Sequence, residues 1–122
     1  MSSQIASKFI HIRDTLKLYH WNTRIYARHV ASDALVDKLA SSIDEIVETI
    51  QGIKRNDRIV FKNTKIKVPN DIEVNKILED FVKWLINCYP KLIPKNGSQP
   101  LLNIRDEVLN DIYKTLYLFN FV

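Results

Sequence analysis

Apolar residues recur along most of this chain at alternating steps of three and four, the spacing that places side chains on one face of an α-helix. Four segments show this pattern. We expect helices from Gln4 to about Tyr26, from Tyr26 or Ser32 to Asn56, from Asn70 to about Tyr89, and from Pro100 to about Phe119. Only two glycines and four prolines interrupt 122 residues, which suits long helices better than short strands. Four helices with one stripe each predict an all-α fold, a four-helix bundle spanning residues 1–122 as one domain.

The third predicted helix has the clearest end signals. Asn70 is followed three residues later by Glu73, an Asn-led variant of the capping box. Pro90 cannot continue a helix, because its ring removes a backbone donor and collides with the preceding turn. We therefore expect Pro90 to stop this helix, with Cys88 buried on its apolar stripe.

Residues 57–69 break the helical pattern and are predicted to be extended. Thirteen extended residues span roughly 40 Å at about 3.3 Å each. The second helix, some twenty-five residues long, measures roughly 38 Å at 1.5 Å per residue. The segment can therefore run the whole length of the bundle as a crossover connection, which predicts that the second and third helices lie parallel.

The rest of the composition limits the setting. No apolar run approaches the length needed to cross a bilayer, and residues 1–4 show no secretory signal, so we expect no membrane partner. A lone cysteine, Cys88, cannot form an intramolecular disulfide, which favours a reducing compartment. We expect an intracellular, cytoplasmic protein, or one packaged in a cell-derived or viral particle.

A Tyr-His-Trp-Asn sequence at residues 19–22 is followed by His29, and Asp44 and Glu48 lie further on in the second helix. This stretch of about thirty-five residues resembles the signature of the mini-ferritins, the DNA-binding proteins from starved cells. In that family the matching residues form an iron-oxidation site shared by two subunits. The resemblance implies a ferritin-like bundle, for which a long crossover is also typical. It further implies iron as the metal, at least a homodimer, and the ligands His20, His29, Asp44 and Glu48.

This sequence departs from the family pattern in two places. The gap between the two histidines is about three residues shorter, and the glycine expected after His-Trp-Asn is missing. Beyond Gly52 only the order of helices agrees. A further likeness, to uncharacterised ferritin-like proteins of large DNA viruses, implies no activity.

Helix geometry places three acidic residues on the outer side of the second predicted helix. At 100° per residue, Asp37, Asp44 and Glu48 fall within about 40° of one another, nearly opposite the apolar stripe of their helix. His20 and His29 flank the first turn and can approach each other, but His29 and Asp44 are about 22 Å apart along the helix. A metal held by all four residues therefore needs a two-fold-related partner. Ile10, Leu18 and Trp21, on the back of the first helix, predict a subunit contact.

Two interpretations of this pattern remain open. An outer acidic stripe is usually solvated, and a histidine near a helix end is usually a cap or a surface group. The alternative to an iron protein is a non-catalytic structural or interaction protein, such as a particle or virion component, that retains the bundle without metal chemistry. No Glu-x-x-His pair is present, so a di-iron centre inside one bundle is not expected.

The crossover and the residues just before it are strongly basic. Phosphate binding through such a patch would be sequence-independent and sensitive to salt. A solvated, lysine-rich connection explains the same residues, and lysines also protect an extended segment from pairing with other strands. We favour the solvated connection and keep nucleic-acid binding as the minor hypothesis, carried by Lys54, Arg55, Arg58, Lys62, Lys65 and Lys67.

Overall fold

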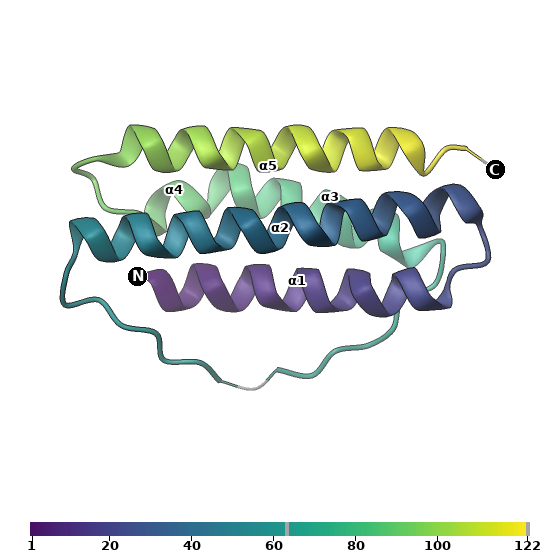
Figure 1. Cartoon of the computed structure of the whole chain (residues 1–122), viewed down its shortest axis with the longest axis horizontal. Coiled ribbons are helices and arrows are strands. Elements are labelled where there is room, and N and C mark those ends of the chain that lie inside the picture. Colours follow the sequence, from purple (N-terminus) through teal and green to yellow (C-terminus); the bar gives the residue numbers. More distant parts are fainter. Residues whose placement is uncertain (63, 122) are drawn as a thin grey trace.

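The computed structural model describes residues 1–62 and 64–121, and in these residues every regular element is helical (Figure 1). The all-α prediction is therefore confirmed. Four helices are long and one is a single turn. They are α1 (Ser2–Asn22), α2 (Tyr26–Ile53), α3 (Glu73–Asn87), α4 (Tyr89–Leu92) and α5 (Ser98–Leu118).

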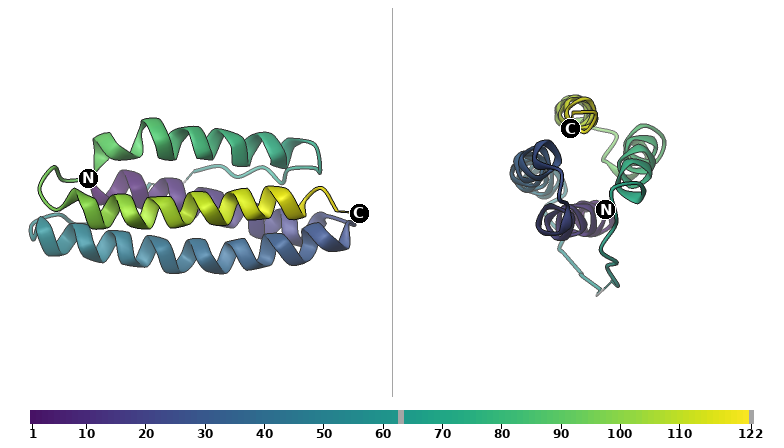
Figure 2. Two further views of the ribbon diagram at one scale, coloured as in Figure 1. Left: turned by 90° about the horizontal axis from the view of Figure 1, so that it is seen from above. Right: turned by 90° about the vertical axis from the view of Figure 1, so that its right-hand side faces the viewer.

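The four long helices lie side by side, as the end-on view in Figure 2 shows, and their buried apolar side chains form one cluster between them. The helices α1 and α2 run antiparallel and pack against each other along their length. The connection from α2 to α3 passes beneath α1 and returns the chain to the opposite end, so α2 and α3 run parallel (Figure 1). The predicted crossover is confirmed in the described part of residues 57–69, which contains no helix.

The core consists of the predicted stripes meeting along the bundle axis. Ile5, Phe9 and Leu16 of α1 are fully buried, as are Leu78 and Phe81 of α3. The rings of Phe9 and Phe81 meet edge to face with centroids 5.3 Å apart, an arrangement that adds to the gain from burial. Each such side chain contributes about 1.5–3 kcal/mol on burial, so the stripes supply most of the drive to fold.

The start of α3 follows the predicted capping signal, and its end comes before the predicted proline. The predicted capping box forms: the Asn70 side chain accepts from the backbone N–H groups of Ile72 and Glu73, and the Glu73 carboxylate accepts from the N–H of Asn70. At the other end α3 stops at Asn87, and Pro90 lies in the first residues of α4. The prediction that Cys88 is buried is wrong, because it lies in the break between these helices and is exposed.

Within residues 1–62 and 64–121, no helix is both long enough and apolar enough to span a membrane.

Candidate metal centre

His20 and His29 lie ring against ring at the junction of α1 and α2. Their ring centroids are 3.9 Å apart and their planes differ by 16°. His20 lies in the last turn of α1 and His29 in the first turns of α2. The three connecting residues, 23–25, turn the chain back so that the two imidazoles stack. The structure thus brings together two of the four predicted ligands.

Hydrogen bonds fix both rings. Nδ1 of His20 is 2.5 Å from the main-chain oxygen of His29, and Nδ1 of His29 is 2.8 Å from the main-chain oxygen of His20. A carbonyl oxygen only accepts, so each Nδ1 carries the hydrogen. In the neutral form each Nε2 then holds a lone pair. A ring held through Nδ1–H to a carbonyl, with Nε2 left to bind, is the usual arrangement of a metal-ligating histidine.

Asp33, one helical turn after His29, lies beside this pair. Its Oδ1 is 3.8 Å from Nε2 of His20 and 2.8 Å from the ammonium nitrogen of Lys17. The hydrogen bond from Lys17 holds the pKa of the Asp33 carboxyl below its ordinary value of 3.8. Asp33 was not among the residues predicted from the sequence. Its spacing of four from His29 was the available signal, because residues four apart share a helix face.

A polar network around Arg28 holds the same corner of the bundle. The carboxylate of Asp71 accepts from the hydroxyl of Tyr19 at 2.7 Å and from that of Thr23 at 2.8 Å. The Arg28 guanidinium donates to the Tyr19 hydroxyl at 3.1 Å, to the Asp71 carbonyl at 2.6 Å and to the Phe119 carbonyl at 3.1 Å. These bonds tie α1, α2, the start of α3 and the end of α5 together, and so position the histidine pair between them.

The hydrogen bonds also set the charge states within the network. The Tyr19 hydroxyl is the main cause that keeps the pKa of the Asp71 carboxyl below 3.8. Burial raises the pKa of Tyr19 above its ordinary value of 10.0. At neutral pH the network therefore contains an anionic Asp71 and a neutral Tyr19, facing a permanently cationic Arg28.

The other two predicted ligands lie elsewhere. Asp44 and Glu48 are exposed on the outer face of α2, as the helix geometry predicted. In the described parts of the chain, residues 1–62 and 64–121, no three His, Cys, Asp or Glu side chains gather so that one chain could hold a metal ion.

The basic crossover residues are all exposed. Lys67 pairs with Glu73 at 3.3 Å, and Arg58 donates to the carbonyls of Arg55 and Asp57. His11 of α1 has its Nε2 3.2 Å from the carbonyl oxygen of Lys65 and so joins the crossover to α1. Arg105 of α5 pairs with the neighbouring Asp106 at 3.0 Å.

Comparison with known proteins places the chain in a family. Residues 20–119 match DUF5856, a family of unknown function, and the chain belongs to this family. The matched region begins at His20 and includes both histidines and the acidic residues of α2. No curated protein and no solved structure matches the chain.

Proposed function

We propose that this protein is a ferritin-like, mini-ferritin-like protein that binds and oxidises ferrous iron between two copies of the chain. His20 and His29 of one copy and Asp44 and Glu48 of the other would hold the ion. The topology supports the proposal, because one long crossover between parallel helices is typical of ferritin-like bundles. The paired imidazoles are its strongest support. Because each Nδ1 donates a hydrogen bond to a carbonyl oxygen, the lone pair of each Nε2 is left to bind a metal ion.

The residues suit the proposed substrate. Neutral imidazole with carboxylate oxygens is a donor set that binds Fe²⁺. The carbonyl bonds keep each imidazole in one tautomer and one orientation, which lowers the cost of ordering the rings on binding. Each Fe²⁺ would lose one electron to dissolved dioxygen, and the reduced oxygen would leave with protons as hydrogen peroxide or water.

One observation favours the second candidate, a structural or interaction protein without metal chemistry. The ammonium group of Lys17 lies 2.8 Å from Asp33, whose carboxylate is beside Nε2 of His20. A fixed positive charge at that position opposes a second cation nearby. In this interpretation the histidines stabilise the junction of α1 and α2, because each imidazole donates a hydrogen bond to the main-chain oxygen of the other residue.

Iron titration separates the two candidates. Anaerobic calorimetry of the wild-type protein with Fe²⁺ near pH 7 should give binding at a fixed stoichiometry per chain. Admission of dioxygen should then oxidise the iron faster than in protein-free buffer. His29→Ala and Asp44→Ala should each abolish both effects, because a four-ligand site loses most of its affinity with one ligand.

His11→Ala is the control for the loss of an imidazole. His11 contacts the crossover and is outside the proposed ligand set, so this variant should bind iron as the wild type does. Wild-type protein that takes up no Fe²⁺ would contradict the proposal and leave the structural candidate.

A further inference from the structure

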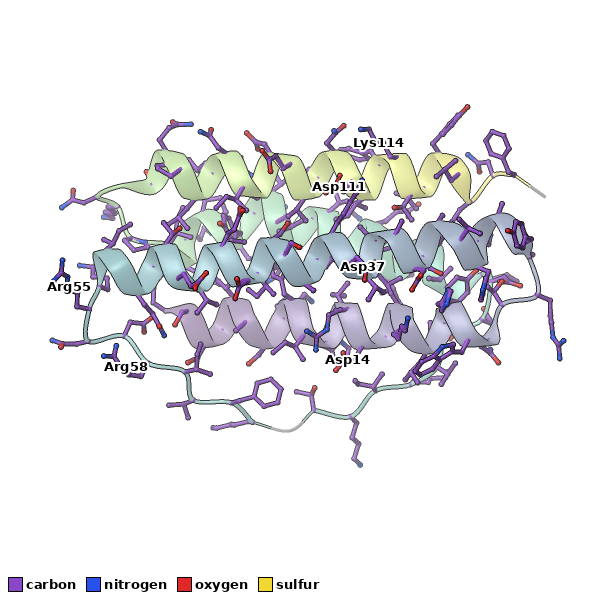
Figure 3. All side chains as sticks on the ribbon, in the orientation of Figure 1. Asp14, Asp37, Arg55, Arg58, Asp111 and Lys114 are labelled. Carbon is purple, nitrogen blue, oxygen red and sulfur yellow. The ribbon has the colours of Figure 1, made fainter. Side chains whose placement is uncertain are left out.

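Residues 58–62, Arg-Ile-Val-Phe-Lys, belong to the first part of the crossover, which leaves α2 and passes beneath α1 (Figure 1). Figure 3 shows Arg55 and Arg58 at the point where the crossover leaves the end of α2. β-branched and aromatic side chains favour a strand over a helix. Ile59, Val60 and Phe61 are of this kind, and 42%, 70% and 45% of their surfaces are exposed. A short strand-like segment therefore lies on the outside of a helical bundle.

Ser3 of α1 holds one edge of this segment. Its hydroxyl donates to the main-chain oxygen of Arg58 at 3.2 Å and accepts from the main-chain N–H of Val60 at 2.8 Å. In an extended chain the N–H and C=O groups of alternate residues point to the same edge, so this edge faces α1. The side chains alternate as well: Ile59 lies over the groove between α1 and α2, whereas Val60 and Lys62 lie along the other flank of α1.

The other edge of the segment faces away from the bundle. The alternation directs the N–H and C=O groups of Ile59 and Phe61 to this outer edge. Within residues 1–62 and 64–121, no hydrogen bond joins the main chain of either residue to another part of the chain. An open strand edge is a template for a further extended chain, which adds to it through main-chain hydrogen bonds. Residues 58–62 can therefore accept one added strand.

Positive charge surrounds the outer edge. Four basic residues of this region are exposed, and in the described residues none of them forms an ion pair: Lys54, Arg55, Arg58 and Lys62. The one acidic residue among them, Asp57, is held against the start of α1, where its carboxylate accepts from the backbone N–H of Ser2 at 3.0 Å. The edge therefore attracts an anionic partner.

The charges also favour one kind of strand over another. Two copies of this segment, paired antiparallel about Val60, would place Arg58 of each copy opposite Lys62 of the other, and like charges directly opposite destabilise a strand pair. An acidic strand would place carboxylates opposite both cations. Single-stranded nucleic acid suits the edge less well, because its bases stack on aromatic rings and two of the three apolar side chains here are aliphatic.

We infer that the outer edge of residues 58–62 binds an extended acidic segment of another protein as an added β-strand. One carboxylate of that segment lies opposite Arg58, a second lies opposite Lys62, and an apolar side chain between them lies opposite Val60. Main-chain hydrogen bonds to Ile59 and Phe61 hold the added strand in register. This interaction does not depend on the proposed iron site.

A designed peptide tests the edge. The probe is the blocked heptapeptide acetyl-Thr-Glu-Thr-Val-Thr-Glu-Thr-amide, whose two glutamates and central valine share one face when the peptide is extended. Added to isotopically labelled protein at low salt, it should slow the exchange of the amide hydrogens of Ile59 and Phe61 with water, as measured by NMR. The Val60 amide already donates to Ser3 and should not change.

Two methylated forms of the probe are matched controls. Methyl groups on the nitrogens of the two threonines beside the valine remove the donors that face the protein, so this form should give no protection. Methyl groups on the two glutamate nitrogens lie on the far edge of the added strand and should leave binding unchanged. The two forms have the same composition and charge, so only a main-chain pairing distinguishes them.

A charge reversal tests the side chains. Lys62→Glu places like charges opposite each other and should weaken binding of the probe at least about threefold. Lys83→Glu makes the same change in charge at an exposed position of α3 and should bind the probe as the wild type does.

Equal binding of the two methylated peptides, or unchanged exchange at Ile59 and Phe61, would overturn the inference. Protection that appears without the probe and rises with protein concentration would mean that a second copy pairs with the edge. Binding of an oligo(dT) strand but not of the probe would mean that the segment recognises phosphate. Either of these results would also overturn the inference.

Discussion

The two ends of α2 are held in very different ways. At its start, Arg28 and His29 bond to main-chain oxygens of α1 and of residues at the ends of α3 and α5. Toward its other end, Asp44 and Glu48 are exposed, and in the described residues neither carboxylate makes an ion pair or a side-chain hydrogen bond. The final turn is followed by the exposed crossover. One helix thus combines a start bonded to three other elements with a far end whose outer face is exposed.

This difference bears directly on the proposed site. The imidazole half is organised by the fold of a single chain, whereas the carboxylate half would become organised only when a second copy covers it. The imidazole side chains lose their conformational entropy when the chain folds. The carboxylate side chains would lose theirs only on assembly, and this loss would weaken binding. Substitutions at the two ends should therefore separate effects on folding from effects on binding.

The largest loss of stability should follow Asp71→Ala. It removes the acceptor of the Tyr19 and Thr23 hydroxyls and leaves Arg28 without its nearby anion. Removal of one partner from such a partly buried network costs about 3 kcal/mol. Urea unfolding at neutral pH measures it, with Asp80→Ala, which breaks only the exposed pair with Lys76, as control. A loss no greater than that of the control would refute the role given to the network.

The loss of stability caused by Asp71→Ala should become smaller as the pH falls. The folded pKa of Asp71 is lower than its ordinary value of 3.8, so the unfolded chain binds this proton more tightly. The contribution is therefore complete above about pH 4 and disappears as the pH falls through the folded pKa. The stability difference between wild type and Asp71→Ala should shrink in acid, and a difference that grew there would contradict the assignment.

A second prediction compares the proposed ligands directly. His20→Ala removes a buried ring that is 8% exposed, its stacking on His29 and its bond to a carbonyl, and should cost about 2 kcal/mol. Asp44→Ala, at an exposed position without partners in the described residues, should change stability by less than about 0.5 kcal/mol. Thermal unfolding of both variants measures the contrast. Equal losses would show that the two ends of α2 do not differ as described.

Much of this arrangement could be predicted from the sequence. Spacing gave the helices, the crossover and the outward direction of Asp44 and Glu48, because each depends on residues close together in the chain. The approach of His20 and His29 was also predictable, since a short turn separates them.

Other features depend on long-range packing. Asp71 reaches Tyr19 across 52 residues, and nothing near either residue in the sequence indicates that contact. Cys88 was expected to be buried because it continues the apolar spacing of the third helix. It is exposed because the helix breaks before Pro90. The stacking and hydrogen bonding of the His29 ring also depend on packing between α1 and α2, so His29→Ala should cost stability as well as a ligand.

The two glycines near the end of α2 should respond to substitution in opposite directions. A Cβ added at Gly52, in the last turn of α2, would meet nothing within 4 Å, so Gly52→Ala should stabilise the helix by roughly 0.5–1 kcal/mol. Gly97, before α5, has φ +77°, and a Cβ there would lie 3.0 Å from Cδ1 of Ile53. Gly97→Ala should therefore lose about 1 kcal/mol or more.

Together the two glycine variants test whether the end of α2 tolerates substitution. A gain at Gly52 with iron uptake unaltered would show that the exposed end tolerates stabilisation without loss of the proposed site. A loss at Gly52 would instead mean that something absent from a single chain packs against that position. Chemical unfolding of both variants at low and high protein concentration separates these cases, because a contact from a second copy would make the loss depend on concentration.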